Sequence, residues 1–556
     1  MIKPASISRP VRIALLSVPY GEGPQAMMPL GLMCIAGYLK ENRPSICDVR
    51  IFDFSDADED NPDVLTPLVE WEADCIGVSV YSSHIPVVTK WVKVLRRCLK
   101  DRTIIVAGGP HISLEPTAFT EAWGHLFDVA FQGDGEDPLM RLVDLLASNG
   151  VDSLSNADML EIPGAYLLSE AGVVEQCKHS NKQLPSGQWG NPFLAQVTSA
   201  GNRSLSFTDF VDNRERRAVA LTSSRGCPLQ CSFCAIIEAD KGTKRWRSVP
   251  AETLIEWLKW EHDQRPFEHV YLMDANFFVQ PARVREFARA LRAQFDGAVT
   301  WSTSSTVGYL LKIRPFLDEL RMNGLRLVEL GIEAGSPTQL KYLNKPVSVE
   351  ENIAAVRALQ ENMIQLGLDY IMFYHRQTVV EIQENLLFLL NCGLTQLEIF
   401  DHYFNILQLY PKTPIRLNEE ILRGIQFDKD VIPDSESLIA DRAVSLVFKF
   451  FMGEFTPKYM SRIERAIAFV RQKIQVRPAE SRLQIVLLKH IPFKILWTLT
   501  EYGEELENHK TIPGLDEIIS PLLKVESEMN LSKSAEQLGK FSLGARGRTT
   551  TYEALV

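Results

Sequence analysis

The chain has 556 residues, of which 46% are hydrophobic and 23% charged, a composition typical of a folded globular protein of about three domains. Its net charge of −11 argues against a general nucleic-acid binder, because contacts with phosphates need a basic surface. We see no secretory signal and no apolar run long enough to cross a bilayer, so we expect a cytoplasmic protein without a membrane partner.

The first predicted domain, residues 1–148, alternates between short apolar runs and amphipathic helical patterns. This alternation is typical of an α/β fold with a doubly wound, mostly parallel sheet. The predicted strands are 11–18, 49–54, 75–80, 103–107 and 129–131, and the predicted helices are 29–41, 64–72, 86–100, 116–125 and 138–148.

Small and polar residues follow the third, fourth and fifth of these strands. Ligands of parallel sheets bind beyond the carboxyl ends of the strands, and glycine lets a ligand approach the backbone closely. Glycine also closes ordinary strand–helix turns, so these positions alone leave both interpretations open. The candidate ligand residues are Ser79, Ser82, Gly108, Gly109, Pro110, His111, Gly133, Gly135 and Glu136.

A predicted linker, 149–216, precedes three closely spaced cysteines, Cys227, Cys231 and Cys234, in a C-x3-C-x2-C pattern. Three thiolates on one loop can bind three irons of a four-iron cluster and leave the fourth iron open to a substrate. Structural zinc usually takes four ligands, often as two cysteine pairs, and no second pair follows here. A disulfide framework is not expected in so long a chain with nine cysteines and no secretory signal.

This cysteine loop resembles that of the radical S-adenosylmethionine (SAM) superfamily. With it, the upstream Gly-Gly-Pro-His at 108–111 and Gly-x-Gly-Glu at 133–136 resemble the flavodoxin-like cobalamin-binding domain of class B members. The resemblance covers about residues 10–420. It implies three cofactors, namely a [4Fe–4S] cluster held by the three cysteines, SAM and cobalamin.

One departure from the family concerns the loop after the first strand. Many cobalamin domains carry Asp-x-His-x-x-Gly there, and the histidine ligates cobalt. Residues 18–29 contain no histidine, so we expect cobalamin without a histidine lower ligand from this loop. His84 and His111 are the nearest alternatives.

Strand and helix patterns resume after the linker and predict a partial (β/α)6 barrel over 217–425, whose active residues should lie at the carboxyl ends of its strands. The predicted strands are 218–222, 269–273, 298–302, 327–330, 367–373 and 396–400, and the predicted helices are 251–263, 281–295, 313–323, 349–365 and 378–391.

The resemblance implies a role for four residues of this barrel in binding SAM. Phe233 would lie against the adenine, Asp274 near the methionine end, and Ser302 at the end of the third strand. Glu333 would accept hydrogen bonds from ribose hydroxyls or the SAM ammonium group. Simple packing of Phe233 and helix capping by Glu333 are the alternative interpretations.

Four polar or aromatic residues replace the bare glycine turns that relatives often carry at the barrel mouth. They are Tyr374, His375, Arg376 and Tyr410, and they are candidates for substrate contact or proton transfer. Ordinary hydrogen-bonded positions at the rim explain each of them equally well.

The pattern of residues 426–530 predicts a helical domain, with helices near 442–451, 458–476 and 481–502. The composition of residues 531–556 predicts a mobile tail. In relatives such a segment closes the barrel mouth. Its apolar helices could instead form an oligomer interface.

The resemblance implies reductive cleavage of SAM to a 5′-deoxyadenosyl radical and transfer of a methyl group from methylcobalamin to a substrate radical. The protein is therefore interpreted as a cobalamin-dependent radical SAM C-methyltransferase that acts on an unactivated or aromatic carbon of a small-molecule natural product. A flavodoxin- or ferredoxin-type electron donor would serve it. Oxidative ring contraction or cyclisation, and non-radical C-methylation of the tryptophan type, are the alternatives; the intact cysteine triplet argues against a non-catalytic corrinoid carrier.

Overall fold

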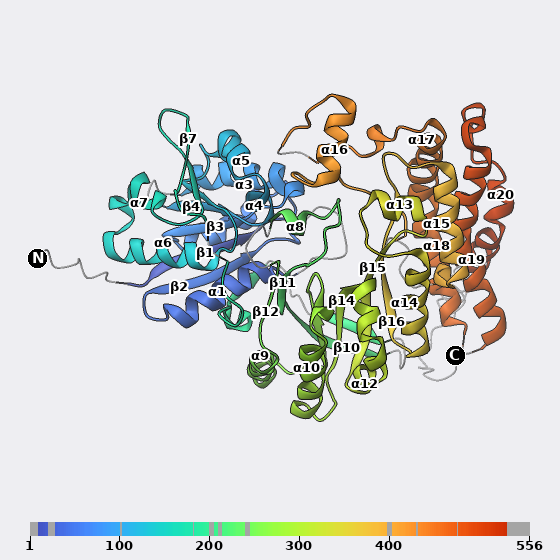
Figure 1. Cartoon of the computed structure of the whole chain (residues 1–556), viewed down its shortest axis with the longest axis horizontal. Coiled ribbons are helices and arrows are strands. Elements are labelled where there is room, and N and C mark those ends of the chain that lie inside the picture. The colour runs from blue at the N-terminus through green and yellow to red at the C-terminus, as the bar shows by residue number, and fades with distance from the viewer. Residues whose placement is uncertain are drawn as a thin grey trace, which may run out of the picture. The chain divides into compact units, whose positions relative to one another are not determined.

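The computed structural model describes residues 9–19, 28–99, 103–181, 183–199, 205–209, 214–239, 245–396, 403–429, 432–474 and 476–530. The chain divides into two compact units, each of which is drawn in Figure 1. The first contains residues up to Glu333 together with Leu340–Tyr370 and Gln408–Asp434, and the second contains Ala334–Gln339, Ile371–Leu407 and the residues from Ser435 onward.

The first unit begins with the predicted doubly wound sheet. Its parallel strands lie in the order β5-β4-β3-β1-β2, which is the flavodoxin-like order 2-1-3-4-5 read from the other edge. The strands are nearly continuous apolar runs, as expected where helices cover both faces. Their bounds are β1 Val11–Ser17, β2 Cys47–Asp53, β3 Cys75–Ser79, β4 Ile104–Gly108 and β5 Val129–Phe131, which confirms the predicted strands to within two residues.

Helices pack on both faces of this sheet. One hydrophobic core joins the sheet to α1 (Leu30–Asn42) and α6 (Glu136–Asn149), and the other joins it to α3 (Ile85–Cys98) and α5 (Pro116–Trp123). Each helix buries the apolar stripe that its sequence pattern predicts.

The predicted linker over 149–216 is wrong for much of its length. The strands β6 (Ala165–Leu168) and β7 (Val174–Gln176) extend the sheet antiparallel beyond β5, and β8 (Val197–Ser199) pairs with β2. β7 and β8 have three residues each, only one of them apolar, and so lack the apolar run by which a strand is usually predicted. β6 is a short apolar run of four residues that the prediction missed.

A second sheet forms the predicted partial barrel. Its strands β10, β13, β14, β15 and β16 are parallel neighbours in that order, and β9 pairs antiparallel with β10. Helices α9 (Ala251–Gln264), α10 (Pro281–Gln294), α12 (Leu317–Met322) and α14 (Val349–Glu361) alternate with the strands. The strand bounds are β9 Leu205–Asp209, β10 Arg214–Leu221, β13 His269–Leu272, β14 Thr300–Thr306, β15 Leu325–Glu333 and β16 Gln365–Phe373.

Several predicted boundaries in the barrel differ from this result. The first strand begins at Arg214 instead of Ala218, and the fourth extends to Glu333 instead of Leu330. The third strand ends at Thr306 instead of Ser302, because its last residues are polar and do not form an apolar run. Most of the predicted sixth strand, residues 397–400, lies outside the described residues.

A short antiparallel hairpin carries the cysteine loop. It consists of β11 (Ser224–Gly226) and β12 (Trp246–Ser248), and Arg225 stands opposite Arg247 in its register. The helix α8 (Ala235–Ala239) follows the third cysteine.

The second unit is mainly helical, as predicted for the region after 426. Within it, the last residues of β16 pair with β17 (Asn405–Ile406), and the helices are α15 (Val379–Asn391), α17 (Arg442–Phe448), α18 (Thr456–Gln472) and α19 (Pro478–Tyr502). Its core is aromatic: the Phe373 and Phe448 rings lie 5.1 Å apart, and the Phe404 and Phe451 rings lie 4.7 Å apart. No helix within the described part of the chain is both long and apolar enough to cross a membrane. The predicted tail, 531–556, lies outside that part.

Candidate functional site

The cysteine loop starts directly after β11, where Gly226 adopts a positive φ of 78° that glycine tolerates without strain. Cys227 and Cys231 are buried and Cys234 is half-buried. Burial raises the pKa of Cys231 to about 11 and raises that of Cys234, because a thiolate loses its hydration there. Binding of iron would therefore release protons from these thiols.

The donor set of this loop fits a cluster better than a single ion. Among the described residues, no three cysteine, histidine or acidic side chains converge closely enough to hold one metal ion. A four-iron cluster does not need such convergence, because each cysteine binds a different iron. In addition, the Asn276 amide lies 3.9 Å from the Cys227 sulfur and points a donor at it, a type of contact that tunes iron–sulfur clusters.

Backbone hydrogen bonds fix the loop to its neighbours in the first unit. The Ser232 N–H donates to the Leu343 carbonyl oxygen at 2.9 Å, and the Ser232 carbonyl oxygen accepts from the Ile415 N–H at 3.0 Å. The Asn344 amide donates to the Gln230 carbonyl oxygen at 2.6 Å. Segments far apart in sequence thus hold the cysteines in place.

Asp274, predicted near SAM, is engaged by the start of the hairpin. Its carboxylate accepts hydrogen bonds from the N–H groups of Ser223 and Ser224, at 2.6 and 3.1 Å, and from both hydroxyls, each at 2.6 Å. Arg283 donates to the Ser223 hydroxyl and carbonyl oxygens from the other side. These contacts make Asp274 a residue that positions the hairpin, and its contact with SAM stays a prediction.

Ser302 does not lie at a strand end. It is the third residue of β14, and its hydroxyl pairs with Nε2 of His269 at 2.9 Å. The His269 ring stacks on Phe207 with centroids 3.7 Å apart, and burial lowers its pKa well below the usual value. The polar residues that do end β14 are Ser305, which donates to Asn276 at 3.0 Å, and Thr306.

Glu333 ends β15, as predicted, and has an unusual backbone. Its φ is +65°, a left-handed conformation that side chains rarely adopt and that is often found at functional sites. Lys345 donates to its carboxylate at 2.7 Å, and both side chains are buried. A Cβ on Gly331 would stand 2.7 Å from that carboxylate and would displace the ends of these two side chains.

A cavity of about 1650 Å³ opens at the carboxyl ends of the first sheet. This exceeds the roughly 300–1,000 Å³ of an ordinary small-molecule pocket and suits a cofactor as large as cobalamin. Gly109 needs to be a glycine, because its φ is +101° and a Cβ would stand 2.9 Å from the Ser79 hydroxyl. The predicted site residues that line the cavity are Ser79, Ser82, Gly108, Gly109, Pro110, Gly133, Gly135, Glu136, Phe233, Cys234 and Tyr410.

The structure places the other candidates elsewhere. His111 is fully buried, and its Nδ1 pairs with the Ser82 hydroxyl at 2.9 Å, so it supports a strand-end turn. Tyr374 and His375 belong to the second unit, where both are buried and the Tyr374 hydroxyl donates to Glu381 at 2.6 Å. Arg376 is exposed in the same unit. The catalytic roles of Tyr374 and His375 stay predictions.

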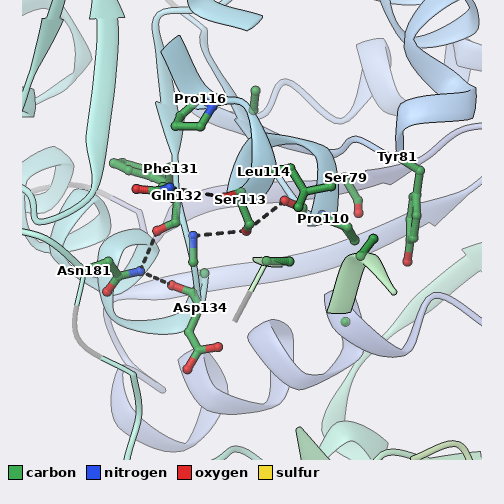
Figure 2. Close-up of a pocket in the computed structure, with 18 of the residues that line it drawn as sticks. Ser79, Tyr81, Pro110, Ser113, Leu114, Pro116, Phe131, Gln132, Asp134 and Asn181 are labelled. Atoms are coloured by element: carbon green, nitrogen blue, oxygen red, sulfur yellow. Dashed lines mark hydrogen bonds between the residues drawn. The ribbon is translucent and has the colours of Figure 1, made fainter. Parts of the chain in front are cut away.

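Sequence reasoning missed a polar cluster at the edge of the cavity, shown in Figure 2. The Asn181 amide donates to the carbonyl oxygens of Gln132 and Asp134, at 2.9 and 2.6 Å. The Gln132 amide donates to the Ser113 carbonyl oxygen, and the Ser113 hydroxyl accepts from the Gly133 N–H. Ser113 and Gln132 adjoin the predicted motifs, whereas Asn181 lies in the predicted linker with no signal around it.

Comparisons with known proteins agree with this arrangement. Residues 221–389 match the radical SAM superfamily, and residues 19–143 match the B12 binding domain. An uncharacterized methyltransferase of Pyrococcus horikoshii is 24% identical over 397 residues, which cover 69% of this chain and 77% of that protein. An anaerobic magnesium-protoporphyrin IX monomethyl ester cyclase of Rubrivivax gelatinosus is 24% identical over 368 residues, which cover 64% of this chain and 60% of the cyclase.

A solved structure has the same fold over nearly the whole chain. The cobalamin-dependent S-adenosylmethionine radical enzyme OxsB with aqua-cobalamin bound aligns with a TM-score of 0.68 and 14% sequence identity, covering 95% of this chain and 82% of that chain. The two matching domains imply a [4Fe–4S] cluster, SAM and cobalamin as cofactors, and the cysteine loop and the large cavity fit these groups. The chain belongs to the cobalamin-dependent radical SAM enzymes, with a B12-binding domain followed by a radical SAM domain.

Proposed function

We propose that the protein is a C-methyltransferase that places a methyl group on an unactivated or aromatic carbon of a small molecule. One observation carries this proposal: the same cavity is lined by Phe233 and Cys234 of the cysteine loop and by the glycine-rich turns after β4 and β5. A methyl donor held at those turns would face the cluster and SAM across one space. Such proximity is what a reaction between two cofactors needs.

Within this proposal the chain's residues have distinct tasks. When bound, the cluster with SAM supplies the radical that activates the substrate carbon, and cobalamin supplies the methyl group. The three cysteines would hold the cluster, and Gly109 and Gly133, both with positive φ, would let a large ring approach the backbone. Burial raises the pKa of Tyr410, so its hydroxyl stays protonated at neutral pH and would orient a substrate by donating a hydrogen bond.

The relatives favour methyl transfer but leave a second candidate. The relative of which the chain covers 77% carries the name of a methyltransferase. The relative of which it covers 60% carries the name of a cyclase, which favours oxidative cyclisation as the alternative. Either reaction would draw electrons from a flavodoxin- or ferredoxin-type donor, and we expect it to take place in the cytoplasm.

Methyl-labelled SAM distinguishes these reactions. Protein produced with cobalamin and purified without oxygen is expected to hold about four irons and one corrinoid per chain. It is then incubated with SAM deuterated in the methyl group, a strong reductant and a library of small molecules. We expect one library member to gain the label while 5′-deoxyadenosine accumulates.

The other outcomes contradict the proposal in distinct ways. Substrate-dependent deoxyadenosine without label in any product would indicate cyclisation or rearrangement, and label without deoxyadenosine would indicate non-radical methylation. Iron without corrinoid, even after reconstitution, would exclude methyl transfer through cobalamin. The Cys234→Ala variant serves as the blank, because it should bind corrinoid but form neither product.

A further inference from the structure

Two arginines of the cluster hairpin face two carboxylates of the turn after β5. Arg225 of β11 forms ion pairs with Glu136 and with Asp134, and its Nη1 lies 3.2 Å from the Asp134 carboxylate. Arg247, which stands opposite Arg225 in the hairpin, pairs with the same Asp134 at 2.6 Å. We call these four residues the charge clamp.

The charge clamp is nearly closed to water. The exposed fractions of its side chains are 19% for Arg225, 2% for Arg247, 12% for Asp134 and 1% for Glu136. Burial alone would lower the pKa of Arg225, but Glu136 and Asp134 outweigh it and raise that pKa above its usual value. Two cations thus balance two anions, and removal of one partner would leave a buried charge uncompensated.

Residues of the predicted linker, 149–216, pack on the charge clamp. The Trp189 ring lies 4.4 Å from the Arg225 guanidinium and 5.9 Å from that of Arg247. The Leu184 N–H donates to Asp134 at 3.0 Å, and the Leu184 carbonyl oxygen accepts from Arg247 at 3.1 Å. The hairpin, the turn after β5 and the linker segment thus all contribute contacts to the clamp, and these contacts fix its geometry.

The position of the charge clamp connects the two halves of the site. Arg225 lies two residues before Cys227 on the strand that leads into the cysteine loop. Asp134 and Glu136 flank Gly135, and all three line the cavity. The ion pairs thus join the strand that leads into the cysteine loop to the turn after β5.

We propose that the charge clamp is a positioning device that fixes the cysteine loop relative to the strand ends of the first sheet and thereby sets the separation of the two cofactors. Glu136 is a candidate cobalamin contact, whereas the two arginines are not predicted to bind the cluster, SAM or cobalamin. Replacement of Arg225 should therefore preserve both cofactors but uncouple SAM cleavage from methyl transfer. The expected effect on catalysis rests on the proposed function. The claim that the clamp holds the cysteine loop in place does not.

The mechanical part is tested by hydrogen exchange of the cofactor-free protein. Glu136→Gln and Arg225→Lys are conservative, since glutamine keeps the shape and lysine keeps the charge but not the fork that spans two carboxylates. We expect Glu136→Gln to speed exchange in the hairpin and cysteine loop, residues 224–234, and Arg225→Lys to speed exchange in residues 132–137 of the other sheet. The control is Asp144→Asn, which breaks the Arg43–Asp144 pair within the first domain.

Exchange that rises only around the mutated position, as in the control, would overturn the inference, because the clamp would then not transmit position across the two sheets. This result is independent of substrate and of the proposed reaction.

The catalytic part is tested in the loaded enzyme. The variant used is Arg225→Lys, because Glu136 is itself a candidate cobalamin contact, and it is expected to keep the iron and corrinoid content of the wild type. The magnetic interaction between Co(II) and the reduced cluster, seen in the electron paramagnetic resonance spectrum, should change, because its strength depends on their separation. The ratio of methylated product to deoxyadenosine should fall by about tenfold to a hundredfold, as expected when reacting groups are misplaced by about 1 Å.

An unchanged magnetic interaction and an unchanged product ratio would overturn the positioning role, even if activity fell. Failure of the proposed function looks different: the wild type itself would then yield no labelled product, while the exchange and magnetic results would still report on the clamp.

Discussion

The backbone of Gly190 lies directly against the backbone of Tyr38: a Cβ at position 190 would stand 1.9 Å from the Tyr38 nitrogen. On the facing segment, a Cβ on Gly37 would stand 2.0 Å from the Asn191 carbonyl oxygen. The two glycines thus let the turn before η4 (Pro192–Leu194) pack on α1. Trp189 of this turn also packs on Arg225, which lies two residues before Cys227. The close packing of the turn on α1 therefore supports the strand that leads into the cysteine loop.

Substitution of Gly190 by alanine should therefore destabilise the protein. The added methyl group meets backbone on the neighbouring helix, which cannot rotate away, and we expect the free energy of unfolding to fall by about 2 kcal/mol or more. Urea denaturation of the cofactor-free protein measures the change. The matched control is Gly308→Ala in α11 (Val307–Ile313), where nothing lies within 4 Å, and which should be neutral or stabilising by up to about 1 kcal/mol. Equal midpoints for the two variants would contradict the packing argument.

Removal of one cluster cysteine should abolish cluster binding and leave corrinoid binding intact. In Cys231→Ala we expect the iron content to fall from about four per chain to a trace and deoxyadenosine formation to stop, because a cluster with one open iron needs three thiolates. Corrinoid content should remain that of the wild type, since no cysteine of the loop belongs to the first sheet. Cys98→Ala, which removes an exposed cysteine, should keep both cofactors. Parallel loss of corrinoid and iron would show that the two sites assemble together.

Glu333 is expected to bind SAM, and its charge can be removed with little change of shape. A charge-assisted hydrogen bond contributes about 1.5–3 kcal/mol, so Glu333→Gln should weaken SAM binding by about tenfold or more while the iron content persists. Anaerobic titration calorimetry gives the affinity. Lys345→Met keeps the carboxylate but removes its partner, and it should weaken binding less. Equal effects of both variants would make Glu333 a structural residue, and the exposed Glu350→Gln controls for loss of negative charge.

The features of the fold and of the cavity lining that agree with the sequence predictions are those that a short segment encodes by itself. The spacing of the three cysteines predicts a loop in which each thiol is available. The alternation of apolar strands and amphipathic helices predicts both sheets, and it places Gly109 and Gly133 at strand ends that line the cavity. Such local patterns survive in any tertiary context that keeps the strand order.

The parts that were missed depend on the approach of distant segments. Arg225 and Asp134 each stand between motif residues, and only the packing of the hairpin on the first sheet pairs them. The hydrogen bonds of Asp274 with Ser223 and Ser224 were missed for the same reason, because they form only where β10 leads the two serines to the end of the neighbouring strand. Ser302 was misplaced because the polar end of β14 does not look like a strand in sequence.

The last prediction concerns pH and the second unit, where Lys489 of α19 is only 4% exposed. Burial, and next the charge of Arg471, lower the pKa of Lys489 to about 8, whereas an unfolded lysine titrates near about 10.4. Below about pH 8 the ammonium group is charged in both states, and the folded state bears the full cost of burying it. Between these two pKa values the folded state has released its proton while the unfolded state keeps it, so stability from this group rises with pH through that window.

Lys489→Met removes this charge while keeping a side chain of similar length. We expect the variant to be more stable than the wild type by up to about 3 kcal/mol near pH 7, and this advantage should shrink steadily toward about pH 10 as the wild type loses its buried charge. Denaturant unfolding in a series of buffers across that range measures the difference. Lys494→Met on the exposed side of the same helix should show no such trend. A difference for Lys489→Met that stays constant with pH would mean that the buried lysine keeps an ordinary pKa, so that burial does not disfavour its charged form there.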